Sequence, residues 1–546
     1  MRADRQAISK RMTTHFAADS ASVRVRSHSQ HDGDWRTEPV DNKREDQDQA
    51  NPKRADIDRP IQIEFAPDGW RGLLDSQMNS QMVATVAQAL ADSLLANFSQ
   101  QANFSQASTT ERTRPAVAIA FDGRRRSREF AHLFARVLTG NDIEVVLADR
   151  VTPTPVVSYT AKARQLSAGI AITASHNPPQ YNGIKFKGAY GGPFFYEATQ
   201  DIERRLGQTP VRMGQSEVQS QSIVDGYLNC LRSLVDLDAI GRSGLRVLVD
   251  SMGGAGQTIV QELLEPYGCD VSTIYGTATP DFSGRSPEPI EKNLAPLKSE
   301  LERGEYALGI ATDGDADRLG VLLDDGSWLS AQETILLVVD HLVTRRGVTG
   351  DIVRTSSVTD TLGLHFGTNR QIHDVQVGFP YICRQLLDDR VAMGFEESGG
   401  YGFSMHLPER DGIFSALLVL EMLAQSGCDR LSDYVARKRQ QFGEIFYHRE
   451  DLHYRSVSQT ELNRVIPRLV QHPPRTLAGY TVRHLSQFHT HRGVLNGVKF
   501  YLEGSPRWLM VRASETEPLL RLYVEGQSER DRQALIAAGL QLLPER

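Results

Sequence analysis

The chain reads Thr173-Ala174-Ser175-His176-Asn177-Pro178 directly after the short apolar run Ala168-Gly169-Ile170-Ala171-Ile172. The apolar run predicts a buried strand, and the residues after it predict a turn rich in Pro, Asn and Gly. Parallel α/β proteins place ligand chemistry in such turns, so Ser175 is a candidate nucleophile or phosphate carrier. The alternative is a surface turn whose Ser and Asn side chains cap the local backbone.

Strands and helices alternate around this turn. The run 116–120 predicts a strand, 127–138 a helix and 143–147 a second strand, which together form a βαβ unit. A similar unit follows, with an amphipathic helix expected over residues 257–267, and a third opens near residue 351. From about residue 450 the order changes to that of an α+β domain. The three α/β units resemble a diverged structural repeat.

Length and composition restrict the class of protein. A chain of 546 residues is too long for one hydrophobic core. A net charge of -7 gives no support for nucleic-acid binding, and no apolar run is long enough for a membrane helix. The four scattered cysteines predict reduced thiols in a cytoplasmic protein. The polar residues 1–58 predict a disordered N-terminal extension.

Three carboxylates, Asp313, Asp315 and Asp317, alternate with Gly and Ala where the strand 306–311 ends. Small spacers allow the three groups to converge, and clustered anions require a counter-ion, so a hard divalent cation such as Mg²⁺ is expected. An EF-hand does not fit, because Arg318 stands where that loop needs Gly. Arg318 would offset the negative charge or hold a phosphate. A solvated acidic turn is the alternative.

Two further loops offer polar ligands. Arg512-Ala513-Ser514-Glu515-Thr516-Glu517-Pro518, with Arg521 beyond it, follows an apolar strand and is suited to cradle a phosphate. A capped helix start is the alternative there. Glu396 and Ser398, in Glu396-Glu397-Ser398-Gly399-Gly400, could bind sugar hydroxyls or occupy an ordinary turn. Lys185 and Arg124 are expected as loop cations that follow strands.

Together the four loops resemble the signature loops of the α-D-phosphohexomutase family, which includes phosphoglucomutases and phosphomannomutases. The resemblance covers about residues 61–546, and Asp68-Gly69-Trp70-Arg71-Gly72 and Phe121-Asp122-Gly123-Arg124 agree with it. It implies a heart-shaped α/β enzyme of four domains: three α/β domains with mixed sheets and a C-terminal α+β domain. The expected boundaries are 59–220, 221–327, 328–440 and 441–546.

The resemblance also implies the chemistry. Ser175 would carry a phosphoryl group and exchange it with a hexose phosphate through a hexose 1,6-bisphosphate. Asp313, Asp315, Asp317 and the phosphoserine oxygen would hold Mg²⁺. Lys185, as general acid or base, and Arg124 would lie beside the transferring phosphate. The expected substrate ligands are Arg318, Glu396, Ser398, Arg512, Ser514, Thr516 and Arg521.

The sequence departs from the family pattern at three places. Gly400 replaces a His of several bacterial members, which leaves His406 as a stand-in proton donor. Pro380 stands where a Lys often follows the segment 377–379, and Glu515 replaces a Gly or Asn. The main expectation is a mutase of glucose or mannose phosphates, either monomeric or dimeric. A glucose-1,6-bisphosphate synthase and a non-catalytic sugar-phosphate sensor remain as alternatives.

Overall fold

A computed structural model describes residues 63–66, 68–104, 112–454, 457–514 and 519–544. The predicted extension over residues 1–58, and Glu515 and Thr516 of the predicted phosphate cradle, lie outside these residues. From Ile61 onward the chain forms one compact unit, whose named strands fall into four sheets. Three of the sheets are mixed and covered by helices, and the fourth is antiparallel, which confirms the predicted fold class.

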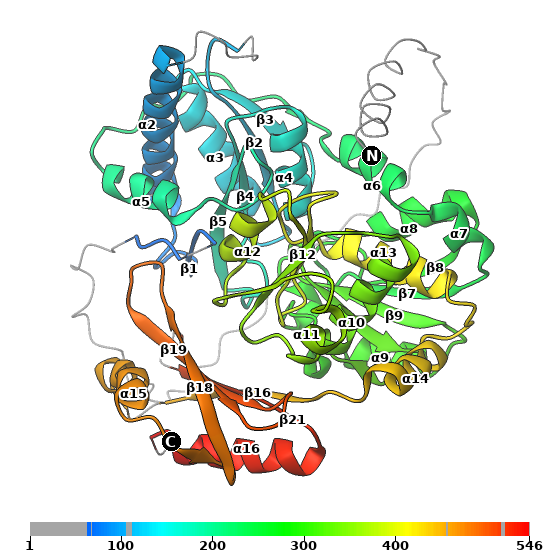
Figure 1. Ribbon diagram of the computed structural model, residues 1–546. Helices are drawn as coiled ribbons and strands as arrows, with labels where there is room; N and C mark the ends of the chain where they lie inside the picture. Colours follow the sequence, from blue (N-terminus) through cyan, green and yellow to red (C-terminus); the bar gives the residue numbers. More distant parts are fainter. Residues whose placement is uncertain (1–62, 67, 105–111, 455–456, 515–518, 545–546) are drawn as a thin grey trace, which may run out of the picture. The chain divides into compact units, whose positions relative to one another are not determined.

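The first sheet presents the Ser175 loop, and its strands run in the order β1-β5-β4-β2-β3-β6. Its elements are β1 (Trp70–Leu73), α2 (Ser80–Phe104), β2 (Ala116–Phe121), α3 (Ser127–Thr139), β3 (Glu144–Ala148), α4 (Thr154–Ala163), β4 (Ala168–Ile172), β5 (Tyr181–Gly188), α5 (Tyr196–Arg205) and β6 (Ser220–Gln221). Side chains of β2 alternate between the two faces. Val117 and Ile119 pack with α2 and α3, whereas Ala118 and Ala120 join the core with α4 (Figure 1).

The second sheet presents the aspartate loop, with the order β11-β10-β9-β7-β8. Its elements are α6 (Val224–Leu234), α7 (Leu237–Arg242), β7 (Arg246–Asp250), α8 (Ile259–Leu264), β8 (Asp270–Ile274), α9 (Ala295–Leu301), β9 (Leu308–Thr312), β10 (Leu319–Leu323) and β11 (Trp328–Leu329). The helix expected over 257–267 is therefore too long. Pro266 has no N–H to continue the α-helical ladder, and the chain passes into a 3₁₀ turn over Glu265–Tyr267.

The third sheet has the order β13-β12-β14-β15. Its elements are α10 (Ala331–Asp340), a π-helical turn (His341–Arg345), β12 (Asp351–Thr355), α11 (Thr361–Phe366), β13 (Ile372–Val375), α12 (Phe379–Leu386), β14 (Val391–Phe395), β15 (Tyr401–Phe403), α13 (Gly412–Ala424) and α14 (Leu431–Phe442). Almost every residue of α13 is buried, because it also packs against β9 and β10 of the second sheet. The second and third sheets therefore share one core.

The C-terminal sheet is antiparallel, with the order β16-β21-β20-β19-β18-β17. Its elements are β16 (Phe446–His453), α15 (Gln459–Gln471), β17 (Thr476–Leu477), β18 (Tyr480–His489), β19 (Leu495–Leu502), β20 (Trp508–Ala513), β21 (Leu519–Gly526) and α16 (Glu529–Gln541). Helix α16 lies against β21 and β16 (Figure 1). Its core is separate from those of the other sheets.

All four signature loops occupy the same kind of position. The Ser175 loop joins β4 to its antiparallel neighbour β5, and the aspartate loop joins β9 to β10 in the same way. The loop containing Glu396 joins β14 to β15, and the fourth loop leads from β20 to β21. This shared topology supports the structural repeat. It also shows that the prediction of a loop position for Lys185 is wrong, since Lys185 lies inside β5 opposite Ala171.

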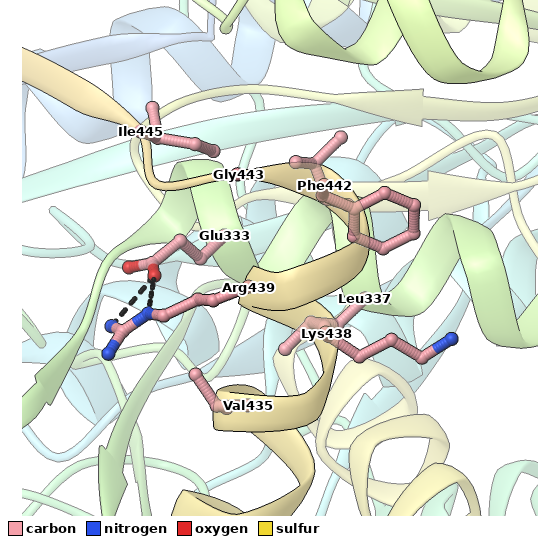
Figure 2. Close-up of a pocket in the computed structure, with 9 residues that line it drawn as sticks. Glu333, Leu337, Val435, Lys438, Arg439, Phe442, Gly443 and Ile445 are labelled. Carbon is pink, nitrogen blue, oxygen red and sulfur yellow. Dashed lines mark hydrogen bonds and ion pairs between the residues drawn. The ribbon is translucent and has the colours of Figure 1, made fainter. Parts of the chain in front are cut away.

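The chain enters the C-terminal sheet through a short connection after α14. Arg439 holds α14 to α10 through Glu333 at 2.8 Å, and Phe442 and Ile445 border a small crevice beside this pair (Figure 2). The crevice holds about 20 Å³, which is room for little more than one water molecule. It is too small for a sugar phosphate. Among the residues that the structure describes, no helix is both long and apolar enough to cross a membrane.

Candidate functional site

Ser175 lies at a strained point of the backbone. Its φ is 52°, a left-handed value that a residue with a side chain adopts at a cost, and such strain concentrates at functional sites. The residue is fully buried, and its Oγ donates to Oδ2 of Asp313 at 2.8 Å. The structure therefore joins the predicted nucleophile directly to the predicted metal triad.

Arg124 holds the Ser175 loop in this conformation. Its guanidinium donates to the backbone carbonyls of Ser175, Asn177, Pro178 and Tyr181 at 2.6–3.1 Å. Its Nε donates to Asp122 at 3.0 Å. These bonds use all five N–H donors of an arginine. Arg124 thus has no donor to spare for a transferring phosphate, and its geometry is that of a positioning residue.

The aspartate triad has the properties of a cation site. One ligand oxygen from each of Asp313, Asp315 and Asp317 lies within 4.8 Å of the others, and all three residues are buried. Within the described part of the chain, Oδ1 of Asp315 and Oδ1 of Asp317 accept no hydrogen bond. Burial, reinforced by the charges of Asp317 and Asp315, raises the pKa of Asp313 well above its ordinary value. An oxygen-ligated divalent cation would relieve this repulsion, so the residues fit Mg²⁺.

Small spacers bring the triad to Ser175. A Cβ added at Gly314 would approach the carbonyl oxygen of Ser175 more closely than the 3.0 Å that real contacts keep. Ala316, the second spacer, has a φ of 59° and turns the chain so that Asp317 faces inward. The alternation of acidic and small residues is therefore a packing requirement at this point.

Lys185 reaches the triad from β5. Its Nζ lies 2.8 Å from Oδ2 of both Asp315 and Asp317, and 3.4 Å from Asp68. Burial would lower the pKa of Lys185, but the three carboxylates outweigh it and raise the pKa above its ordinary value. The group is therefore a fixed ammonium. Its charge in turn lowers the pKa of Asp315, against the effect of burial.

Arg410 is a second cation at the triad, and it explains the departure at Gly400. Its guanidinium lies 2.9 Å from Asp317 and 3.5 Å from Glu396, and it also pairs with Asp68. A side chain at Gly400 would collide with the stem of Arg410. The space that a side chain at position 400 would need is thus occupied by Arg410.

The hypothesis that His406 stands in for a His at position 400 is wrong. His406 is buried, and its Nε2 lies 2.8 Å from Asp411 while its Nδ1 faces Cys230. Both ring nitrogens are therefore engaged in a cluster of their own, and neither is available to the sugar site.

A cavity of about 250 Å³ lies above the triad. It is lined by loops of all four sheets, and His176, the neighbour of Ser175, forms part of its wall. Six of the predicted substrate ligands line it, namely Arg318, Glu396, Ser398, Arg512, Ser514 and Arg521. Ser175, Lys185 and the triad lie beneath this wall, and Asp68 and Arg410 connect them to it.

One end of the cavity is built for an anion. Arg512 on β20 and Arg521 on β21 are directly paired across the strands, which places two guanidinium groups side by side in the cavity wall. Asp451 on β16 offsets part of this charge at 3.4 Å from Arg521. Arg449, two residues before Asp451, adds a third guanidinium to the cavity wall.

Glu396 is buried in the wall of the cavity. Burial raises the pKa of Glu396 to about 7, although the nearby charge of Arg410 opposes the shift. Its neighbour Glu397 also lines the cavity, and it accepts a hydrogen bond from the Ser357 hydroxyl at 2.6 Å. Both glutamates thus line the cavity, and Glu397 is also held by a hydrogen bond from Ser357.

The pKa of His176 is set by its burial and by the cations around it. Burial and the charges of Arg318, Arg71, Lys185 and Arg410 hold the pKa of His176 well below its ordinary value. The imidazole is therefore neutral, with four cationic side chains around it. Positive charge of this kind favours an anion nearby.

Sequence reasoning missed five residues of this site. Asp68 and Arg71 belong to a segment that agrees with the family, so their position could have been predicted. His176 adjoins the candidate serine. Arg410 and Arg449 follow no motif, and only the packing of α13 and β16 reveals them.

Comparison with protein families divides the chain into four successive domains, one for each sheet. Successive models described as the phosphoglucomutase/phosphomannomutase alpha/beta/alpha domains I, II and III match residues 62–211, 225–326 and 330–442. The C-terminal domain of the same family matches residues 479–540.

Individual relatives cover most of the chain. A phosphoglucomutase/phosphomannomutase of Thermococcus kodakarensis is 26% identical over 80% of this chain and 91% of its own length. A phosphoglucosamine/phosphogalactosamine mutase of Sulfurisphaera tokodaii is 25% identical over 85% of this chain and 95% of its own length. The crystal structure of a candidate phosphomannomutase from Thermus thermophilus superposes with a TM-score of 0.73 at 30% identity, covering 88% of this chain and 99% of the other.

Proposed function

Because the chain belongs to the phosphoglucomutase/phosphomannomutase family of mutases, we propose that it interconverts hexose 1-phosphates and hexose 6-phosphates of glucose or mannose. The reaction runs through a phosphorylated Ser175 and a hexose 1,6-bisphosphate. One observation supports this most directly: a strained, buried serine donates to a carboxylate of a cation site, beneath a cavity with paired arginines in its wall.

In this proposal Ser175 carries the phosphoryl group and Arg124 fixes the loop that presents it. Lys185 acts as the proton donor and charge partner of the transferred group. Its three carboxylate neighbours keep it protonated. Phosphoryl transfer asks a protein mainly for positioning and charge stabilisation, and a buried lysine held between aspartates provides both.

Asp313, Asp315 and Asp317, with an oxygen of the phosphoserine, are proposed to hold Mg²⁺. When bound, the ion neutralises charge on the transferring phosphoryl group. Two of the aspartates meet Lys185, and Arg410 contacts Asp317. These contacts hold the carboxylates of Asp315 and Asp317 in a fixed orientation.

The cavity is proposed to bind the hexose at both ends. Glu396, Ser398 and Arg318 meet the sugar, and Arg512, Ser514, Thr516 and Arg521 hold the phosphate that does not react. Arg449 extends this phosphate site from β16. Because a bisphosphate has a phosphate at each end, it can reverse in the cavity and present either one to Ser175.

The test uses the full chain with glucose 1-phosphate, Mg²⁺ and a trace of glucose 1,6-bisphosphate. We expect glucose 6-phosphate to form, and a phosphoryl group to appear on Ser175 in peptide mass spectra. Ser175→Ala removes both, whereas Ser327→Ala, in an exposed turn, keeps both. Mannose 1-phosphate and glucosamine 1-phosphate, tested in parallel, identify the preferred sugar.

Two results would redirect the proposal. Slow isomerisation with net accumulation of bisphosphate from a separate donor would assign a bisphosphate synthase instead. A chain that binds hexose phosphates but never phosphorylates Ser175 would be a sensor. The melting temperature of the wild-type protein distinguishes these two results from a failed preparation, because a folded, binding-competent protein should melt at a higher temperature when substrate is added.

A further inference from the structure

A second group of reactive side chains lies outside the cavity. Cys230 on α6 places its Sγ 3.8 Å from Nδ1 of His406. Nε2 of the same ring lies 2.8 Å from Oδ2 of Asp411. Tyr227, one helical turn before Cys230, donates to both oxygens of Asp411 at 2.9 Å. A thiol, a base and a carboxylate that orients the base are thus in line.

The partners of the two ring nitrogens differ. A carboxylate accepts only, so Nε2 of His406 donates its N–H to Asp411, and in a neutral imidazole Nδ1 is then the acceptor. Nδ1 is the atom that faces the Cys230 thiol. Burial and the charge of Asp411 raise the pKa of Cys230, so the group rests as a thiol and needs a base to ionise. His406 is in position to be that base.

The surroundings hold this arrangement, and Cys230 is only partly buried. Asp411 is buried and also caps α13 by accepting from the N–H of Phe414 at 2.8 Å. The ammonium of Lys162 donates to the carbonyl oxygen of His406 at 3.0 Å and is the cation near the thiol. Cys230 itself is half-buried, whereas Cys269 and Cys383 are buried. Tyr159, whose pKa is raised by burial and by Cys230, completes the titratable groups around the sulfur.

We propose that Cys230 is a modification site, a thiol activated by the His406–Asp411 pair and oxidised by hydrogen peroxide to a sulfenic acid. The sulfur attacks one peroxide oxygen and forms an S–O bond as the O–O bond breaks. The thiol proton passes to Nδ1 of His406 and from there to the leaving hydroxide, which becomes water. The sulfur loses two electrons and the peroxide gains them, so one thiol and one peroxide give one sulfenic acid and one water.

The experiment compares cysteines within one molecule. The full chain is exposed to limiting hydrogen peroxide, sulfenic acid is trapped with dimedone, and the labelled fraction of each cysteine is followed by peptide mass spectrometry. Cys428 is the internal reference, because it is also half-buried and, among the described residues, no histidine hydrogen-bonds to it. General-base assistance gives rate gains of about a hundredfold or more, so we expect Cys230 to label at least ~10-fold faster than Cys428.

A variant tests the base. His406→Gln keeps a polar side chain but has no titrating nitrogen, and it should reduce Cys230 labelling to the rate of Cys428. The labelling of buried Cys383 in the same sample reports folding, since it rises if the variant is unfolded. Should the variant not fold, the comparison within the wild type still decides. Equal rates at Cys230 and Cys428 in wild type, or an unchanged Cys230 rate in folded His406→Gln, would overturn the proposal.

Discussion

The contact between Gly314 and Ser175 can be tested with a single methyl group. Gly314 does not have a left-handed φ, so alanine there is conformationally allowed and its effect is steric. The added Cβ would lie under 3.0 Å from the Ser175 carbonyl oxygen, 3.2 Å from Phe282 and 3.3 Å from Pro287. With contacts on several sides, the methyl group cannot be accommodated by rotating one flexible side chain.

The size of the effect follows from these distances. An ordinary contact begins at 3.4 Å, so the aspartate loop and the Ser175 loop must separate by at least 0.4 Å. That movement lengthens the 2.8 Å bond between Ser175 and Asp313. Overpacking costs about 1–3 kcal/mol, so the melting temperature of Gly314→Ala should fall. Misplacement of reacting groups by about 1 Å can cost a hundredfold, so we expect kcat to drop roughly 10- to 100-fold.

The assay measures kcat and KM with glucose 1-phosphate at saturating Mg²⁺, together with the melting temperature. Gly363→Ala is the matched control, because it sits in α11 and, apart from its chain neighbours and the backbone of that helix, no described atom lies within 4 Å of its added Cβ. Alanine should stabilise that helix by roughly 0.4–1 kcal/mol and leave kcat unchanged. If Gly314→Ala keeps kcat within about threefold of wild type, a loss below ~1 kcal/mol, the close approach of the two loops is not needed for turnover.

Three further predictions concern charge and positioning. Arg124→Lys keeps the charge but cannot serve four carbonyls with one ammonium, so phosphorylation of Ser175 and kcat should both fall while KM changes little. Glu396 has a pKa of about 7 and binds hydroxyls best when ionised, so kcat/KM should rise as pH increases through that value. Glu396→Gln should remove that rise and retain only the titration of the substrate phosphate. Arg512 and Arg521 place two guanidinium groups side by side in the cavity wall, so inorganic phosphate should bind there and raise the melting temperature of wild type, and Arg512→Ala should abolish most of that rise.

Each of these has an outcome that contradicts it. A lysine at position 124 with full Ser175 phosphorylation would show that the loop needs only the charge. Identical pH profiles for wild type and Glu396→Gln would remove Glu396 from substrate binding. An equal phosphate effect on wild type and Arg512→Ala would place the anion elsewhere.

The sequence by itself determined the fold class and four loops. A run such as Ala168–Ile172 has no polar side chain and can only be a buried segment, and the Ser175 turn after it is a local feature. The alternation of Asp313, Asp315 and Asp317 with small residues is equally local, and it indicated a cation site that the converging, buried carboxylates fit. Signals of this kind depend on neighbours within a few residues, which a sequence displays directly.

Only the tertiary structure decided which partners those residues meet. Arg124 resembled a catalytic cation, but its five donors are used by the backbone that it supports and by Asp122. His406 resembled a proton donor for the cavity, yet it belongs to a cluster with Cys230 and Asp411. Arg410 gave no local signal, and it reaches Asp317 because α13 packs against the second sheet. The orientation of a long charged side chain depends on contacts far away along the chain, and local sequence does not encode them.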